Sequence, residues 1–316
     1  MKIGIDIMGG DYAPNKTVEG AILANENLPN NIKLVLFGNI DVIESELKKF
    51  NYDKNRFEII NCSEVIKMDE HPTKAIREKK DSSISKGFDF LAKNKIDGFC
   101  SAGNTGAMFV GGFYALKTIT GVLRPPLCTL LPREDGKSTV LLDVGANADC
   151  KADVLYQFGL LGSLYSKYVC GVKNPKVKLL NLGEEKNKGN MLTQSTYVLM
   201  ENNPDFNFQG NCEGRDIFSE EIDVIVCDGF TGNIVIKQAE AVYSIMKKRD
   251  TLDDFFSRLN YEDYGGTPIL GLSKPVIIGH GISNEIAIKN MINLTKDIIK
   301  SDLTYKIKNN FSQWIK

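Results

Sequence analysis

The sequence predicts a doubly wound α/β fold, in which helices cover both faces of a mostly parallel sheet to form an α/β/α sandwich. Short apolar runs rich in β-branched residues alternate along the chain with longer stretches of helical periodicity. Such alternation is typical of parallel βαβ units. A length of 316 residues, 42% of them hydrophobic, also suffices for a large buried core. We therefore expect one domain over residues 1–316, with a small helical excursion at about residues 237–264.

The strands are expected where three to six residues, most of them apolar, lie between turn-forming residues. In chain order these runs are 3–8, 34–37, 57–61, 98–101, 127–131, 140–144, 177–182, 206–209, 224–227 and 276–278. The helices are expected where apolar residues recur at spacings of three and four. These stretches are 17–25, 40–50, 73–80 continuing to 93, 107–118, 154–169, 190–201, 234–248 and 284–300.

Five loops made mostly of Gly, Asn, Asp, Ser and Thr follow expected strands. They are residues 6–11, 101–106, 143–147, 228–233 and 279–281. Such loops expose backbone N–H groups, and a helix that follows adds partial positive charge at its N-terminus. One loop alone is most simply a tight turn with a helix cap. Five at the carboxyl ends of strands instead predict a site that binds anions.

Composition and the remaining motifs exclude several functional classes. The formal net charge is −1, so the chain has no overall positive field to attract nucleic acid. Neither a Walker A motif nor a G-x-G-x-x-G after the first strand is present, which disfavours ATP and dinucleotide sites. Seven cysteines without a C-x-x-C pair indicate a reducing compartment. No signal peptide or membrane-spanning run is found, so we expect a cytoplasmic protein.

The loop residues divide by charge into two groups. Amides and hydroxyls donate hydrogen bonds without adding negative charge, which favours contact with phosphate or a carbonyl by Asn104, Thr105, Asn147, Thr231 and Asn233. Asp143 and Asp228 would repel phosphate and are expected to hold the loops in shape. Hard-cation sites need several converging carboxylates, and we predict no metal.

The two histidines have different expected roles. His280 lies between Gly279 and Gly281 directly after a strand, where an imidazole with an ordinary pKa of about 6.5 could orient phosphate or protonate a departing thiolate. A histidine that only hydrogen-bonds within its turn remains the alternative. His71 precedes Pro72 in a charged stretch and is expected on the surface.

Together these motifs resemble the bacterial phosphate acyltransferases, the acyl-acyl carrier protein:phosphate transacylases of phospholipid synthesis. The match runs in order along nearly the whole chain, from residue 1 to about residue 290. The segments that carry it are 3–11 with Ala13-Pro14, 101–107, 142–147, 182–185 and 227–233. The resemblance implies that a long-chain acyl-acyl carrier protein and inorganic phosphate become acyl phosphate and free carrier protein, without a cofactor. A membrane glycerol-3-phosphate acyltransferase would then use the acyl phosphate.

The candidate site combines the loops with this resemblance. The expected catalytic residues are His280, Asn104 and Asn233. The expected phosphate- and thioester-binding residues are Gly9, Gly10, Asp11, Ser101, Gly103, Thr105, Gly106, Asp143, Gly145, Asn147, Glu184, Asp228, Gly229, Thr231, Gly232 and Gly281. Phosphate is itself the nucleophile in this reaction, so the protein needs only to bind it beside a thioester and to stabilise the oxyanion. The sequence has no G-x-S-x-G elbow, and Cys100 and Cys227 are expected in the core.

Residues 237–264 bear on the partners of the protein. Apolar residues there flank the basic cluster Lys247-Lys248-Arg249, and the arm is shorter than in many members of the resembled family. We expect helices packed on the body or on the second subunit of a homodimer, with contact to the membrane surface or to the acyl carrier protein as the alternative. Carrier proteins are acidic, so Lys and Arg near the site would dock them.

Three other functions remain open at this point. A phosphotransacylase acting on acyl-coenzyme A thioesters would have a similar fold and similar loops. A metal- and NAD-dependent dehydrogenase of the isopropylmalate type would share a related sheet but lacks support from an adenosine fingerprint. A scaffold that binds acyl carrier protein without turnover is the non-enzyme alternative.

Overall fold

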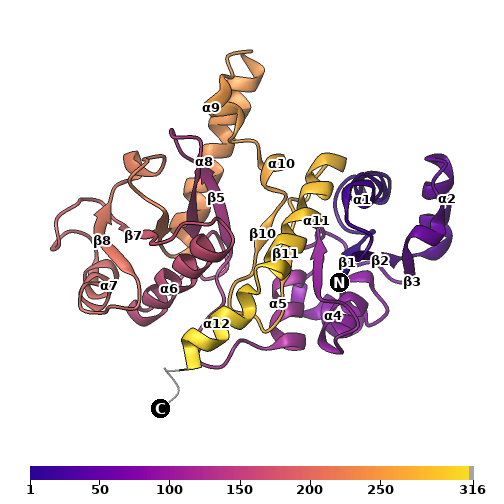
Figure 1. Cartoon of the computed structure of the whole chain (residues 1–316), viewed down its shortest axis with the longest axis horizontal. Helices are drawn as coiled ribbons and strands as arrows, with labels where there is room; N and C mark the ends of the chain where they lie inside the picture. Colours follow the sequence, from indigo (N-terminus) through magenta and orange to yellow (C-terminus); the bar gives the residue numbers. More distant parts are fainter. Residues whose placement is uncertain (313–316) are drawn as a thin grey trace. The chain divides into compact units, whose positions relative to one another are not determined.

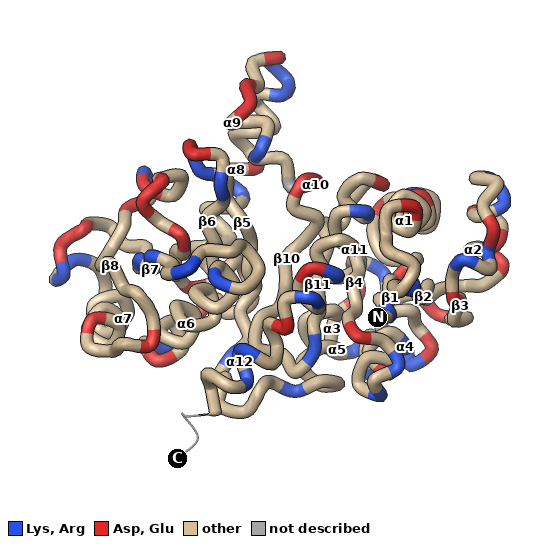
Figure 2. The backbone as a smooth tube through the Cα atoms, viewed as in Figure 1, with Lys and Arg blue, Asp and Glu red and all other residues tan. Residues whose placement is uncertain are grey.

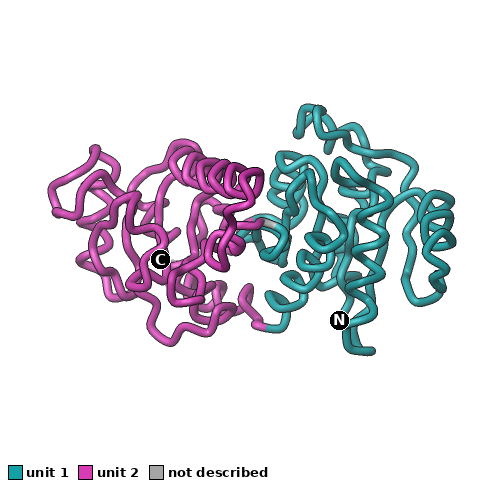
Figure 3. Tube along the Cα trace, turned by 90° about the horizontal axis from the view of Figure 1, so that it is seen from above, with its two compact units in different colours: residues 1–117, 261–300 teal, residues 118–260, 301–316 magenta. Residues whose placement is uncertain are grey.

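The chain folds into two compact units (Figures 1 and 3). The computed structural model describes residues 1–312, apart from the side chain of Tyr261. Unit 1 comprises residues 1–117 and 261–300, and unit 2 comprises residues 118–260 and 301–316. The expectation of one domain over 1–316 stays a prediction, because a compact unit need not act alone.

Unit 1 contains a six-stranded sheet with the order β10-β11-β4-β1-β2-β3, and every neighbouring pair except β10 and β11 is parallel. The strands are β1 (Lys2–Asp6), β2 (Lys33–Gly38), β3 (Glu58–Asn61), β4 (Gly98–Ser101), β10 (Thr267–Pro268) and β11 (Val276–Ile278). The helices are α1 (Asn15–Asn27), α2 (Ile40–Lys49), α3 (Pro72–Glu78), α4 (Ser83–Ala92), α5 (Thr105–Leu116), α10 (Tyr261–Tyr264) and α11 (Glu285–Lys300).

Helices cover both faces of the unit 1 sheet. Figure 1 shows α1 and α11 side by side on one face, and α4 with α5 on the other. Because both faces are covered, the middle residues of the central strands are mostly apolar, and Ile3, Ile5 and Phe99 are fully buried. Phe99 meets Phe37 and Phe88 edge to face, with ring centroids 5.8 and 5.3 Å apart.

Unit 2 contains a five-stranded sheet with the order β5-β6-β9-β7-β8, in which only β5 runs antiparallel to its neighbour. The strands are β5 (Cys128–Pro132), β6 (Ser138–Leu142), β7 (Lys176–Leu180), β8 (Asn207–Cys212) and β9 (Val224–Val226). The helices are α6 (Ala152–Tyr168), α7 (Met191–Glu201), α8 (Gly229–Lys248), α9 (Asp254–Ser257) and α12 (Leu303–Ser312). Short 3-10 turns occur at Lys54–Arg56 in unit 1 and at Gly214–Asp216 in unit 2.

The unit 2 sheet is also covered on both faces. Leu141 and Ile225 belong to a core cluster against which Val235 of α8 packs. The alternate residues Leu142 and Val224 face the other way, because they lie against the backbone of α6 at Gly162. Successive strand residues therefore enter different cores, as the two-residue period of a strand requires.

The mostly parallel α/β class is confirmed, and all ten predicted strands form. Three details differ. The strands divide between two sheets, β10 was not anticipated, and the stretch 73–93 is two helices, because Ser82 starts α4 with a side-chain cap to the Ser85 N–H at 3.2 Å. The predicted excursion at 237–264 contains the second half of α8 together with α9 and α10. Figure 2 shows Lys and Arg interspersed with Asp and Glu over both units, in keeping with the net charge of −1.

Candidate functional site

In unit 1, three loops meet at the carboxyl ends of β1, β4 and β11, which are neighbours in the sheet. The Asp11 N–H donates to the Gly281 carbonyl at 2.7 Å, and the Gly279 N–H donates to the Ser101 carbonyl at 2.8 Å. The loops are also in direct backbone contact, since a Cβ at Gly9 would lie 2.7 Å from the backbone nitrogen of Gly103. The structure thus brings together the predicted residues of these three loops, and we call this group the β1/β4/β11 cluster.

Asp6, the last residue of β1, is buried and holds this cluster together through hydrogen bonds. Its side chain is 1% exposed, and it accepts hydrogen bonds from the Ser101 hydroxyl at 2.7 Å and from the Met8 N–H at 2.9 Å. The Ser101 hydroxyl in turn accepts from the Gly103 N–H at 2.9 Å. Burial raises the pKa of Asp6, while the hydrogen bonds from Ser83, Ser101 and the backbone oppose that rise.

Asn104 is fully engaged in holding structure. Its Oδ1 accepts from the Ala107 N–H at 2.9 Å and so caps α5. Its Nδ2 donates to the carbonyls of Lys67, Met68 and Glu70 at 3.0 to 3.1 Å. The amide therefore ties a distant segment to the start of α5.

The first turn of α5 lies beside this anchored segment. A Cβ at Gly106 would approach Pro72 of α3 to 2.4 Å, whereas Thr105 is exposed. No acidic residue occurs in the first turn, so the partial positive charge of the helix N-terminus is not offset there.

His280 is half-buried and follows β11 in a loop with two anchors. The preceding Gly279 is bonded to Ser101, and the His280 carbonyl accepts from both the N–H and the hydroxyl of Ser283, at 2.9 and 2.6 Å. These contacts fix the backbone that carries the imidazole. His71 is exposed, as expected.

In unit 2, the carboxylate of Asp143 holds the loop after β6. Asp143 is fully buried, and its Oδ1 accepts from the N–H groups of Leu127, Gly145 and Ala146 at 3.0 to 3.2 Å. Its Oδ2 accepts from the backbone and the side-chain amide of Asn147 at 2.7 and 2.8 Å. Five donors to one carboxylate agree with the structural role expected for Asp143.

Asp228 has the corresponding structural role after β9. It caps α8, with Oδ1 accepting from the Thr231 N–H at 2.8 Å and Oδ2 from the Thr231 hydroxyl at 3.0 Å. The Gly229 N–H donates to the Asn147 carbonyl at 2.8 Å. A Cβ at Gly232 would stand 1.9 Å from the Asp143 carbonyl oxygen, so only glycine fits where α8 crosses the β6 loop.

We call the β6 loop and the first turn of α8 the β6/β9 cluster. Within it, Asn233 and Gly145 are exposed and close together, with Oδ1 of Asn233 3.7 Å from the Cβ position of Gly145. The Asn233 side chain makes no hydrogen bond to any residue that the structure describes, so its amide can serve a ligand. Glu184 is exposed in the loop after β7, and within residues 1–312 no side-chain hydrogen bond connects it to the cluster.

The thiols are not set up as nucleophiles. All seven cysteines are free, and burial raises the pKa of every one of them, to about 12 in the case of the half-buried Cys150. A thiolate, rather than a thiol, is the reactive form. Cys100 and Cys227 are buried, as predicted.

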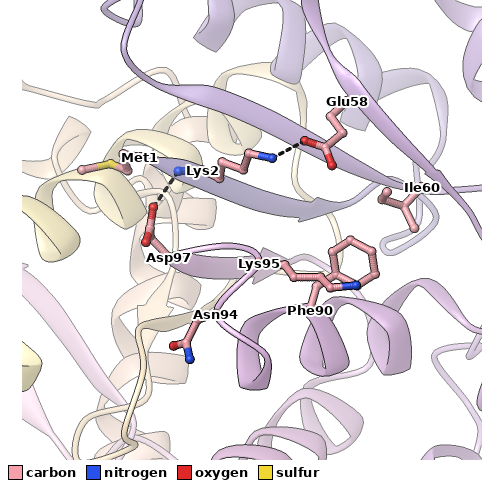
Figure 4. A pocket seen from close by; sticks show the side chains of 8 residues that line it. All are labelled: Met1, Lys2, Glu58, Ile60, Phe90, Asn94, Lys95 and Asp97. Atoms are coloured by element: carbon pink, nitrogen blue, oxygen red, sulfur yellow. Dashed lines mark hydrogen bonds and ion pairs between the residues drawn. The ribbon is translucent and has the colours of Figure 1, made fainter.

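Two cavities lie away from both loop clusters. One of about 590 Å³ lies at the amino ends of β1 and β3, the opposite edge of the unit 1 sheet from the loops, where Lys2 pairs with Glu58 at 2.7 Å (Figure 4). The other, of about 480 Å³, lies in unit 2 between Leu123, Tyr156 and Leu199. Neither is lined by a predicted site residue.

Two further observations concern metal and membrane. In residues 1–312, no three His, Cys, Asp or Glu side chains gather as a set of metal ligands, and the expectation of no metal stays a prediction. No helix within the same residues combines the length and apolar character needed to span a bilayer.

Sequence reasoning missed two contributors to the unit 1 cluster. Asp6 was recognised only as part of a motif, although an acidic residue that ends an apolar strand is the same signal that marked Asp143 and Asp228. The segment Lys67–Glu70 carried no local signal, because it joins the cluster through residues distant in sequence, namely Asn104, more than 30 residues later, and Gly281, which Met68 contacts.

Comparisons with known proteins agree with this geometry. The model of a family described as "Fatty acid synthesis protein" matches residues 1–306. A phosphate acyltransferase of Dictyoglomus thermophilum is 43% identical over 332 residues, which cover 99% of this chain and 98% of the relative. One from Clostridioides difficile is 41% identical, covering 93% and 91%. Among solved structures, the EutD phosphotransacetylase from Staphylococcus aureus has a TM-score of 0.64 at 16% identity, covering 95% of this chain and 94% of the other, which shows a shared fold.

Proposed function

The chain belongs to the phosphate acyltransferase family and is an acyltransferase, and from this premise we propose that its acyl donor is a long-chain acyl-acyl carrier protein. The acceptor is inorganic phosphate. The observation that supports this reaction type is that the carboxylates and the neutral donors of the loops have different surroundings. The carboxylates of Asp6, Asp143 and Asp228 turn onto the loops' own donors, whereas Thr105 and Asn233 are exposed. The charge of these three carboxylates is thereby directed away from a surface that must accept anions, whereas Asp11 stays exposed.

The chemistry needs a bound phosphate and donors for an oxyanion. An oxygen of hydrogen phosphate attacks the thioester carbonyl carbon, and N–H and amide donors stabilise the resulting oxyanion. The tetrahedral intermediate then collapses with cleavage of the C–S bond. The products are acyl phosphate and a thiolate, which takes up the proton that the phosphate loses.

We assign roles to individual residues on this basis. The exposed amide of Asn233 and the hydroxyl of Thr105 contact phosphate or the carbonyl oxygen, and His280 delivers the proton to the thiolate. Thr231 is not given this role, because its hydroxyl donates to Asp228. Asp6, Asp143, Asp228 and Asn104 are positioning residues. The high thiol pKa values support this mechanism, because acyl transfer through a cysteine would need a thiolate.

The partners follow from the same proposal. The protein acts in the cytoplasm as a homodimer and passes acyl phosphate to a membrane glycerol-3-phosphate acyltransferase. Peripheral membrane contact is proposed for α8, where Ile245 is 56% exposed beside the basic end of the helix at Lys247 and Lys248. Sedimentation with phospholipid vesicles tests that contact.

The test of the reaction is an assay of the purified protein with palmitoyl-acyl carrier protein, with and without phosphate. Released thiol and hydroxylamine-trapped acyl phosphate are measured together. We expect both products to form, and only when phosphate is present. Products from acyl-coenzyme A alone would instead support the phosphotransacylase, and turnover only with NAD and Mg²⁺ would support the dehydrogenase. Binding of the carrier protein without either product would support a scaffold.

A further inference from the structure

Large apolar side chains are exposed in one corner of unit 1. Among the described residues of this unit, six large hydrophobic side chains are exposed, and four of them are Tyr12, Met68, Ile282 and Ile286, which are 40 to 54% exposed. The other two, Phe113 and Tyr114, lie near the end of α5. We call the group of four the apolar rim.

Backbone contacts bring the rim together beside the β1/β4/β11 cluster. Tyr12 follows Asp11 and Ile282 follows Gly281, and Asp11 and Gly281 are hydrogen-bonded at 2.7 Å. Met68 joins them from a distant segment, because a Cβ at Gly281 would stand 2.9 Å from its methyl group.

Two further contacts hold the rim in place. Asn104, which caps α5 in the cluster, fixes the Met68 backbone by donating to its carbonyl at 3.1 Å. Ile286 lies four residues after Ile282, as the second residue of α11. That start is tied to α1 by the ion pair of Lys16 with Glu285 at 2.8 Å.

We propose that the apolar rim binds the first methylenes of the acyl chain and makes the enzyme prefer long chains. This inference rests on the proposed function. The rim lies beside the loops that would hold the thioester. The acyl chain, which extends from the thioester carbon, therefore lies directly on the rim. Methionine suits such a subsite, because its unbranched side chain adapts to a flexible ligand.

The charges around the rim favour the acyl chain over a membrane surface as the occupant. Asp11 and Asp69 are exposed beside Tyr12 and Met68. These two carboxylates outnumber the one exposed ammonium of the same segments, that of Lys67, so the local charge does not attract the anionic lipids of a bilayer. They do not hinder a single alkyl chain, whose own surface is uncharged.

Binding of stable substrate analogues tests the proposal without any need for turnover. The probes are acyl-pantetheine analogues of four and twelve carbons in which CH₂ replaces the thioester sulfur, and affinity is measured by calorimetry. Each buried methylene strengthens binding about fourfold. We expect Met68→Ser and Ile282→Ser each to weaken binding of the twelve-carbon probe about tenfold, and binding of the four-carbon probe less than threefold.

The matched control is Met191→Ser, which removes a methionine that is 87% exposed on α7 of unit 2 and should change neither affinity. The proposal would be overturned if the rim variants lost affinity equally for both probes, or if both variants kept the wild-type preference for the twelve-carbon probe. If the rim variants lost binding to phospholipid vesicles but kept the preference for the twelve-carbon probe, the rim would be a membrane contact instead. If the wild type binds the probes with the expected preference but forms no acyl phosphate from any thioester, the proposed function fails and the subsite remains.

Discussion

The hydroxyl of Ser101 lies 2.7 Å from Oδ2 of Asp6 and donates a hydrogen bond to it, so a buried carboxylate joins the ends of β1 and β4. The same hydroxyl accepts from the Gly103 N–H, which extends the connection into the loop before α5. The shape of this loop therefore depends on an acidic group that no ligand needs to touch.

Asp6 should make the stability of the protein depend on pH in a defined direction. Burial raises its pKa above the usual 3.8, so between the two pKa values the folded state holds a proton that the unfolded chain has released. This contribution is complete below about pH 3.8 and is lost as the pH rises through the folded pKa. Urea denaturation from pH 4 upward should show Asp6→Asn gaining stability relative to wild type as the pH increases. For the control Asp149→Asn, at an exposed position, the free energy of unfolding should change with pH in parallel with that of the wild type. The same parallel dependence for Asp6→Asn would contradict the prediction.

Gly232→Ala should damage the β6/β9 cluster. The new methyl group would stand 1.9 Å from the Asp143 carbonyl oxygen, so α8 or the β6 loop must move. We expect the free energy of unfolding to fall by more than about 2 kcal/mol. We expect kcat/KM to fall by a larger fraction than the free energy of unfolding does. Gly214→Ala is the control, because a Cβ there meets no atom within 4 Å. Wild-type stability of Gly232→Ala would show that the backbones can separate at no cost.

Asn233→Ala should reduce activity without reducing stability. Its exposed side chain has no hydrogen bond to the described part of the chain, so removing the amide leaves no buried group unsatisfied. We expect kcat/KM for acyl phosphate formation to fall about 100-fold, as when one oxyanion donor is lost, with an unchanged urea midpoint. Asn309→Ala, an exposed asparagine on α12, serves as the comparison. Retention of full activity would remove Asn233 from the site.

Cys150→Ala should keep activity within about twofold. Cys150 is the cysteine closest in sequence to the β6 loop, but burial raises its pKa to about 12, which leaves almost no thiolate at neutral pH. Iodoacetamide at pH 7.5 should accordingly leave the turnover of the wild-type protein intact. Rapid inactivation that Cys150→Ala prevents would indicate a thiol in the reaction.

Local signals in the sequence predicted the elements of the fold but not their partners. The apolar runs located β1 and β4, and Asp143 and Asp228 were correctly expected to hold their loops. The division into two sheets depends on which strands pair, and pairing between distant segments leaves no periodic mark. The break before α4 did leave a mark, since Ser82 is a typical N-cap, but the helical periodicity was expected to continue across it to residue 93.

The candidate site shows the same limit. Asn104 was expected to face a ligand because it begins a helix in a polar loop. Its amide instead binds three carbonyls of the segment Lys67–Glu70, and nothing near Asn104 in the sequence announces that segment. Asn233 lies within α8 of unit 2, five residues after the N-cap Asp228, and is exposed, so the sequence alone did not separate a structural from a ligand-binding asparagine.

The insertion of unit 2 between residues 117 and 261 has a consequence for synthesis on the ribosome. When residue 260 has emerged, β4 has β1 on one side but still lacks β11 on the other, and α1 lacks α11. A nascent chain therefore carries an open strand edge throughout the translation of unit 2, a condition that favours aggregation. Pairing of β11 closes that edge, and the loop at 279–281 completes the β1/β4/β11 cluster last, so a truncated product ending near residue 260 cannot assemble it.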